Sequence, residues 1–233
     1  MTRPEPQTLT GGDRIGRALA FGIAIPFVYF GIQIVAARFY PGYSFLNRDA
    51  STLGSEGSTA PWIFNVGTLV VGLCEVVAAW GFLRGLPRVR AGAVLAWATC
   101  VALVSSALGS INAFLHPLPD PRHTEGVLSI LGAGVLVLPV ITGLMLWRLR
   151  GRALVTPALV LSVLVWLTLI PIMSGLVQRL SVIAQIDMPG FQAFLNGYHG
   201  VLQRVAAAAV LGPVAFVAWL LRRFSREQGA VVG

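Results

Sequence analysis

The side chains best suited to chemistry lie in short polar stretches beside long apolar runs. Asp49 and Ser51 share one stretch, the proline-rich segment 116–123 holds two histidines and an aspartate, and another histidine stands at residue 199. Imidazole and carboxylate groups transfer protons and bind zinc. The candidate catalytic residues are therefore Asp49, Ser51, Asp120, His123 and His199.

The spacing of these residues matches no established motif for a metal centre or a hydrolase. His116, His123 and His199 are the candidate metal ligands, but the prolines of segment 116–123 favour hydrogen bonds that order a loop. Ser51 could act as a nucleophile with a histidine as base, although no G-x-S-x-G turn surrounds it. Residues 49–51 could equally cap a helix. The sequence therefore predicts no metal and no cofactor.

The composition sets the environment in which these residues act. Of 233 residues, 56% are hydrophobic and 11% are charged, whereas a soluble domain carries about 25% charged residues. The net charge of +8 comes from 17 basic residues, all of them arginine. A basic soluble protein would suggest nucleic acid, but these arginines lie mainly at the ends of apolar runs, where a bilayer explains them. We predict an integral membrane protein that binds no nucleic acid.

Six segments are long and apolar enough to cross about 30 Å of hydrocarbon. In lipid the backbone must satisfy its own hydrogen bonds, so these segments are predicted to be helices. We expect an all-α membrane protein, a six-helix bundle forming one domain over residues 1–233, with tails at 1–17 and 222–233. The predicted spans are 18–37, 62–83, 91–110, 127–147, 154–177 and 199–221.

The arginines also predict the orientation of the bundle. Twelve lie at the two termini and in the second and fourth loops, against four in the remaining loops. The positive-inside rule therefore places both termini in the cytoplasm of a multi-pass cell-membrane protein. The longer loops 38–61, 111–126 and 178–198 would face outward and carry most of the chemically capable side chains.

Polar residues recur at three- and four-residue spacing near the outer ends of several spans, which places them on one helix face. Two interpretations stay open: hydrogen bonds that pack the helices together, or a polar cavity open to water. If a cavity forms, the candidate substrate-binding residues are Arg122, Arg204, Asn65, Asn112 and Gln203.

Glu75 is the one acid deep in a predicted span, roughly 20 Å below its outer end. A charge at mid-bilayer costs at least about 2.5–3.5 kcal/mol, so such residues are usually partnered. Arg204 lies too near the outer end to pair with it. We expect Glu75 to be protonated and hydrogen-bonded to neutral side chains, with Thr99 and Ser162 at matching depth.

Three stretches resemble a known family. Residues 50–54 (ASTLG) followed by 61–65 (PWIFN) look like the first-loop signature of the six-span bacterial and archaeal family called domain of unknown function 998. Residues 120–126 and 200–204 are similar to its second outer loop and last span. A fainter likeness links the chain to the Frag1/DRAM/Sfk1 family of six-span proteins, associated with lipid-anchor remodelling, autophagy and lipid asymmetry. The resemblance implies polar family positions at Ser51, Gly54, Asn65, Asp120, His123 and Arg204.

Three functions remain open. The first is binding or remodelling of a lipid or isoprenoid from the outer leaflet, with an anionic headgroup at Arg122 and Arg204. Acid–base chemistry would then fall to Asp49, Asp120 or His123. The second is a non-catalytic structural or accessory subunit, and the third is a proton-linked small-solute transporter that uses Glu75. Membrane lipids are the expected partners, and a homo-oligomer or a partner membrane protein is compatible with each function.

Overall fold

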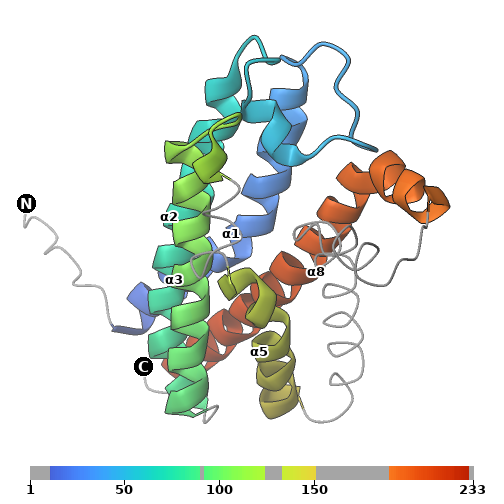
Figure 1. The fold of residues 1–233 in the computed structure, drawn as a ribbon. Coiled ribbons are helices and arrows are strands. Elements are labelled where there is room, and N and C mark those ends of the chain that lie inside the picture. Colours follow the sequence, from blue (N-terminus) through green and yellow to red (C-terminus); the bar gives the residue numbers. More distant parts are fainter. Residues whose placement is uncertain (1–10, 90–91, 124–132, 151–188, 231–233) are drawn as a thin grey trace, which may run out of the picture.

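In the computed structural model, residues 11–89, 92–123, 133–150 and 189–230 are described, and the regular elements within them are all helical (Figure 1). This confirms the all-α prediction for the described part of the chain. The long helices are α1 (Gly11–Ala37), α2 (Pro61–Gly85), α3 (Ala93–Leu115), α5 (Ala133–Arg150) and α8 (Pro189–Ala230). Two short 3-10 helices, η1 (Ala50–Gly54) and η2 (Leu86–Val89), lie before and after α2.

Four of these helical segments have the length and hydropathy needed to cross a membrane: Asp13–Ala37, Pro61–Val89, Ala93–Leu115 and Gly197–Phe224. They correspond to the predicted spans 18–37, 62–83, 91–110 and 199–221. The predicted span 127–147 is covered in part by α5, whose apolar stretch is shorter, and the predicted span 154–177 lies outside the described residues. The apolar helices make the chain a membrane-embedded protein.

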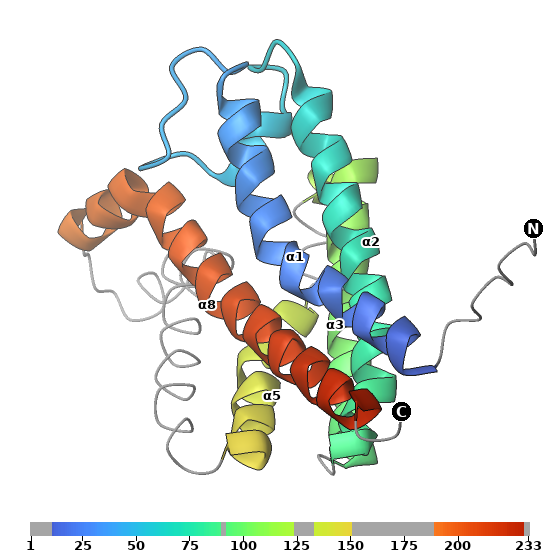
Figure 2. The same cartoon turned by 180° about the vertical axis from the view of Figure 1, so that it is seen from behind.

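The five long helices pack in a closed order in which each contacts two neighbours along the ring. α2 lies between α1 and α3, α5 joins α3 to α8, and α8 packs back against α1. Figures 1 and 2 show α8 crossing the bundle obliquely, with segment 38–60 at one end. The beginning of α1 and the end of α8 lie toward the opposite end of the bundle.

Small residues allow the helices to approach closely, as they commonly do in membrane proteins. A Cβ atom added to Gly22 of α1 would lie 3.0 Å from Ala218 and 3.4 Å from Ala78, so α1 touches both α8 and α2 there. Gly134 of α5 lies against the backbone of α3, and its N–H donates to the Ser105 hydroxyl at 3.1 Å. The buried core continues between these contacts through Leu19 and other apolar side chains.

Three helix ends lie beyond the predicted span ends, because hydropathy marks the membrane and not the end of a helix. α8 begins at Pro189 instead of residue 199, so the end of the predicted loop 178–198 is helical. Proline suits a first helical turn, whose N–H groups need no intrahelical partner. The same helix continues to Ala230, through the predicted tail, and α3 reaches Leu115 instead of residue 110.

Candidate functional site

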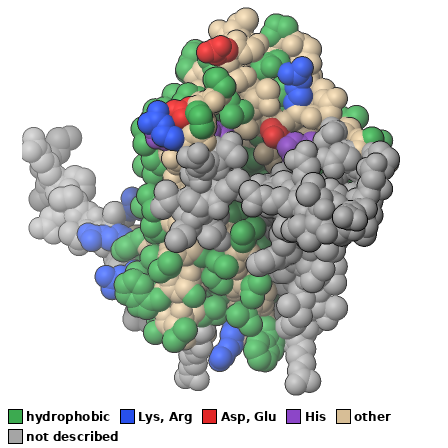
Figure 3. Space-filling model, in the orientation of Figure 1, with side chains coloured by type: hydrophobic (Ala, Val, Ile, Leu, Met, Phe, Trp, Pro, Cys, Tyr) green, Lys and Arg blue, Asp and Glu red, His purple; other side chains and the backbone are tan. Residues whose placement is uncertain are grey.

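Charged and histidine side chains gather at the end of the bundle where segment 38–60 meets the start of α8. Figure 3 shows them above a surface that is largely apolar. We call residues 43–50 and 199–204 the rim. Every sequence-predicted site residue of the rim is described, so its contacts can be followed one by one.

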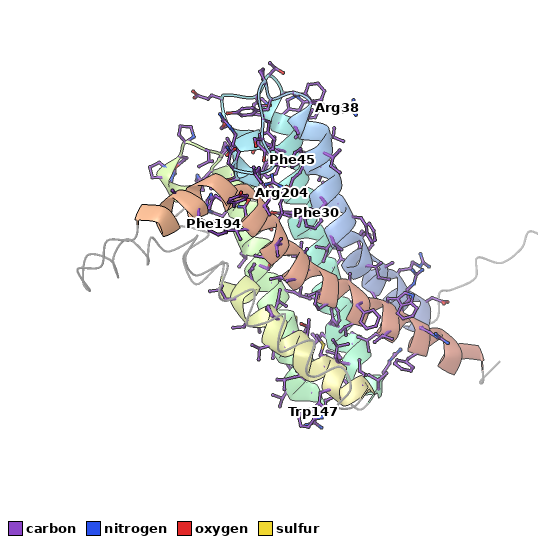
Figure 4. The ribbon with its side chains drawn as sticks, turned by 90° about the vertical axis from the view of Figure 1, so that its right-hand side faces the viewer. Phe30, Arg38, Phe45, Trp147, Phe194 and Arg204 are labelled. Carbon is purple, nitrogen blue, oxygen red and sulfur yellow. The ribbon has the colours of Figure 1, made fainter. Side chains whose placement is uncertain are left out.

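Arg204 of α8 connects the two parts of the rim. Its Nη1 donates to the backbone oxygens of Phe45 at 3.1 Å, Arg48 at 3.0 Å and Gly200 at 2.8 Å. Its Nη2 donates to the Tyr43 hydroxyl, and its guanidinium carbon lies 4.9 Å from the centre of the Phe45 ring (Figure 4). The terminal nitrogens of this predicted substrate-binding residue are thus engaged with the protein.

Further backbone contacts hold segment 38–60 against α8. The amide of Ala50 donates to Gln203 Oε1 at 2.8 Å, and the amide of Val201 donates to the Leu46 oxygen at 3.0 Å. Gly200 permits this approach, because a Cβ there would lie 2.4 Å from the Arg48 oxygen. Gln203, another predicted binding residue, therefore also contacts the protein.

Asp49 and His199 form an ion pair across the rim when the imidazole is protonated. Oδ1 and Nδ1 lie 2.7 Å apart, with the two side chains 31% and 30% exposed. Apart from this contact, Oδ1 accepts no hydrogen bond from the described residues. Burial raises the pKa of Asp49, and the nearby charges of His199, Arg204 and His123 oppose that rise.

The Asp49 carboxylate does not cap a helix. Asp49 stands at the N-cap position of η1, but its side chain makes no capping hydrogen bond. The alternative that residues 49–51 cap a helix therefore holds for the position of Asp49 and not for its carboxylate, which lies 2.7 Å from His199 Nδ1. No described histidine hydrogen-bonds to Ser51, so a Ser51–histidine nucleophile pair is not assembled.

Segment 116–123 is ordered by contacts among its own residues. Asp120 accepts hydrogen bonds from the Arg122 guanidinium, with Nη2 at 2.7 Å, and lies 3.3 Å from His116 Nδ1. The Arg122 hydrogen bonds lower the pKa of Asp120. His123 Nδ1 lies 2.9 Å from the His116 oxygen, and Asn112 Nδ2 donates to the Arg122 oxygen at 3.0 Å.

The structure thus brings together only part of the predicted site. Asp49, His199 and Arg204 meet at the rim, and His123 lies within electrostatic range of Asp49. Asp120 and Arg122 are paired with each other instead. Among the described residues, no three histidine, cysteine, aspartate or glutamate side chains lie close enough together to hold a metal ion.

Tyr43 is a rim residue that the sequence analysis did not single out. Its hydroxyl donates to the backbone oxygen of Asp49 at 2.8 Å and accepts from Arg204 Nη2, so it joins the Arg204 side chain to the backbone of segment 43–50. Burial raises the pKa of Tyr43, against the effect of Arg204. The sequence feature that could have pointed to Tyr43 is the group of aromatic residues in loop 38–61, a composition typical of a membrane interface.

Asn65, predicted to bind substrate, connects α2 to η1. Its Nδ2 donates to the Gly54 oxygen at 3.1 Å, and a Cβ at Gly54 would lie 2.0 Å from its Oδ1. The family signature in residues 50–54 and 61–65 therefore coincides with a packing contact.

Glu75 lies far from the rim, between α2 and α3, with 2% of the residue exposed. Its carboxylate accepts hydrogen bonds from the Ser106 hydroxyl at 2.7 Å and the Ser110 hydroxyl at 3.3 Å. Both partners are neutral hydroxyls, and the Thr99 hydroxyl at matching depth donates instead to the Leu95 oxygen one turn earlier. Ser162, the other residue predicted at this depth, lies outside the described residues.

Comparisons with known proteins give one match. A model of the family described as "Protein of unknown function (DUF998)" matches residues 23–220. No curated protein and no solved structure matches the chain. The matched range includes the rim, Glu75 and all of the apolar helices that could span a membrane, in whole or in part. This membrane-embedded chain therefore belongs to the DUF998 family.

Proposed function

We propose that this protein binds the polar end of a membrane lipid or isoprenoid at the rim. The observation that carries the proposal is the half-exposed Asp49–His199 pair at the end of an apolar bundle. Apolar side chains are exposed on the same two segments of the chain, Phe45 and Leu46 before Asp49 and Phe194 before His199. Such side chains suit the boundary between acyl chains and headgroups.

The Asp49–His199 pair also supplies the chemistry that remodelling of such a lipid would need. His199 Nδ1 faces Asp49, which leaves Nε2 for a headgroup, and no described residue hydrogen-bonds to that nitrogen. A carboxylate beside an imidazole orients the ring, the arrangement used in general acid–base catalysis. Binding is the primary proposal, and acid–base catalysis at His199 is its extension.

Lipid analysis of the purified protein tests the proposal. Wild type, His199→Ala and Glu56→Gln are purified in mild detergent, and the retained lipids are quantified by mass spectrometry. Glu56 is an exposed acid in the same loop, so its variant controls for loop charge. We expect wild type and Glu56→Gln to retain lipid in near-stoichiometric amounts and His199→Ala to lose most of it. Equal retention by all three proteins would refute the rim as the site.

We further propose six spans with both termini in the cytoplasm, so that the rim opens outward. The arginine distribution supports this orientation. In a variant whose two cysteines, Cys74 and Cys100, are replaced by alanine, a cysteine introduced at Glu56 should react with a membrane-impermeant maleimide added outside cells. A cysteine introduced at Arg148 should react only after lysis. The reverse pattern would refute the orientation.

A structural or accessory role is the second candidate, and a specific observation favours it. Arg204, Gln203 and Asn65 all use their polar atoms on the protein itself. If these side chains only hold parts of the protein together, His199→Ala will retain as much lipid as wild type, while alanine variants of Arg204, Gln203 and Asn65 will lose stability.

A further inference from the structure

Glu75, Ser106 and Ser110 form a closed polar cluster between α2 and α3, which lie side by side (Figure 1). Glu75 Oε1 lies 2.7 Å from the Ser106 hydroxyl, and Oε2 lies 3.3 Å from the Ser110 hydroxyl. Glu75 is 2% exposed and Ser106 is 4% exposed, within helices that could span a membrane. The carboxyl group is therefore shut off from water, and each of its oxygens faces a hydroxyl.

No cation neutralises Glu75 among the described residues, whose ion pairs do not include it. The ionisable side chains at membrane depth on the neighbouring helices α1, α3 and α8 are Tyr29, Cys100 and Arg204, and none of them lies within electrostatic range of the carboxyl group. Cys74, its neighbour on α2, does lie within range, but a thiol supplies no positive charge. A carboxylate without a counter-charge is strongly disfavoured at this depth, so Glu75 holds a proton in the closed bundle.

The two serines can satisfy the carboxyl group both with its proton and without it, because a hydroxyl donates as well as accepts hydrogen bonds. When Glu75 is protonated, Ser106 donates to Oε1, and the proton on Oε2 is donated to Ser110. The hydrogen of Ser110 can then go to a backbone oxygen one turn earlier, as that of Thr99 does. When Glu75 is ionised, both serine hydroxyls donate to it. Such a cluster can release a proton and take it up again.

The packing around the cluster leaves no room for water beside an ionised carboxylate. A Cβ added to Gly72, one turn before Glu75 on α2, would lie 3.0 Å from the Ala107 oxygen of α3. A Cβ added to Gly134 of α5 would lie 2.9 Å from the Ser106 nitrogen. Two hydroxyls replace only part of the water that an ionised carboxylate binds. Ionisation therefore favours separation of α2 from α3, since water then reaches the charge.

We propose that Glu75, Ser106 and Ser110 form a proton-binding site inside the membrane, and that release of the proton opens the contact between α2 and α3. The ligand is the proton itself, which needs no cavity. The site lies away from the rim and goes beyond the proposed function, because it does not depend on a lipid headgroup. It gives the protein a second activity, a proton-dependent movement of two helices.

Infrared spectroscopy of the detergent-purified protein tests the proton-binding site. The C=O stretch of a protonated carboxyl group is separate from the bands of a carboxylate, and exposed carboxyl groups are ionised at neutral pH. We expect wild type at neutral pH to show a protonated-carboxyl band that Glu75→Gln lacks. Glu56→Gln removes an exposed acid and should keep the band. Ser106→Ala should move the band to higher frequency, since it removes the hydrogen bond to the C=O oxygen.

Hydrogen exchange followed by mass spectrometry tests the opening as the pH is raised. Exchange of the amides 103–110 of α3 is compared in wild type and Glu75→Gln at each pH, because the ratio of the two rates removes the intrinsic effect of pH. Glutamine keeps the shape of the protonated side chain, accepting from Ser106 and donating to Ser110. The two proteins should exchange equally while the band is present, and wild type should exchange at least about tenfold faster once it is lost. The amides 214–221 of α8 are the control and should exchange equally in both proteins.

The wild-type titration by itself can refute the proposal, so the test does not depend on the folding of a variant. A wild-type protein without the band at neutral pH has an ionised Glu75, and a band that Glu75→Gln keeps comes from another carboxyl group; either result refutes the site. A band that persists up to the pH of unfolding marks a fixed structural proton, which also overturns the proposal. Loss of the band with equal exchange in both proteins, or with equally faster exchange in α8, would refute a local opening of α2 and α3.

Discussion

Replacing Arg204 with alanine should release the outer segment from α8 without unfolding the bundle. The side chain donates to the oxygens of Phe45 and Arg48 and to the Tyr43 hydroxyl, all on the segment between α1 and α2. A hydrogen bond to a charged group contributes about 1.5–3 kcal/mol when buried, and about 1 kcal/mol is reasonable for a half-buried guanidinium. Three such bonds amount to about 3 kcal/mol, or an increase of about 100-fold in the opening equilibrium.

Hydrogen exchange followed by mass spectrometry measures this opening directly. The amides of Ala50 and Val201 report on the contact between segment 43–50 and α8, because each donates a hydrogen bond from one of these parts to the other. Both should exchange about 100-fold faster in Arg204→Ala. The exchange rates of these amides in Arg204→Lys should lie between those of wild type and Arg204→Ala, since an ammonium lacks the planar guanidinium group that reaches several oxygens. Arg48→Ala is the control, because its exposed bond to the Tyr40 hydroxyl should contribute at most about 1 kcal/mol.

Two results would refute this reasoning about Arg204. Unchanged exchange at Ala50 and Val201 would mean that the other contacts hold the segment without the guanidinium. Equally faster exchange throughout α1, α2 and α8 would mean that Arg204 supports the whole bundle, so the effect would be global instead of local.

Three further predictions concern close packing, the buried acid and pH. Gly200→Ala should destabilise the protein by about 1–3 kcal/mol in thermal unfolding, since the new Cβ would lie 2.4 Å from the backbone oxygen of Arg48. Gly212→Ala on the same helix is the control. Its Cβ would meet nothing within 4 Å, so this variant should be neutral or stabilising. Glu75→Gln should change the free energy of unfolding by less than about 1 kcal/mol, because an amide oxygen still accepts from Ser106; if it selectively stops solute uptake in vesicles, the transporter alternative gains support. Because burial raises the pKa of Asp49, its contribution to stability is largest below the ordinary value of 3.8 and falls as pH rises through the shifted pKa. Unfolding temperatures measured upward from pH 4 should therefore fall, and Asp49→Asn should remove the part of this fall that Asp49 causes. The same fall of unfolding temperature with pH in wild type and Asp49→Asn would contradict the burial of Asp49.

Much of the fold was predictable because it depends on local composition. The helices over 18–37, 62–83, 91–110 and 199–221 were expected from apolar length alone, and the structure contains them. Their ends were predicted less well. α8 begins at Pro189, where a proline can open a helix regardless of the membrane boundary.

The candidate site was predictable by residue type but not by pairing. Asp49, His199 and Arg204 were all singled out, yet nothing in their spacing showed that the first two would meet. Asp120 is an equal candidate by residue type, but its carboxylate is paired with Arg122. Hydrogen-bond partners of this kind depend on which helices are neighbours, and a pattern along one helix does not contain that information.

The sequence by itself determined that this chain forms helices embedded in a bilayer. That follows from composition, since few charges and long apolar runs leave the backbone no other way to satisfy its hydrogen bonds in lipid. Only the tertiary structure decided what the scarce polar groups do. Ala50 meets Gln203 across 153 residues and Tyr43 meets Arg204 across 161, and such contacts exist only because α8 packs back against α1.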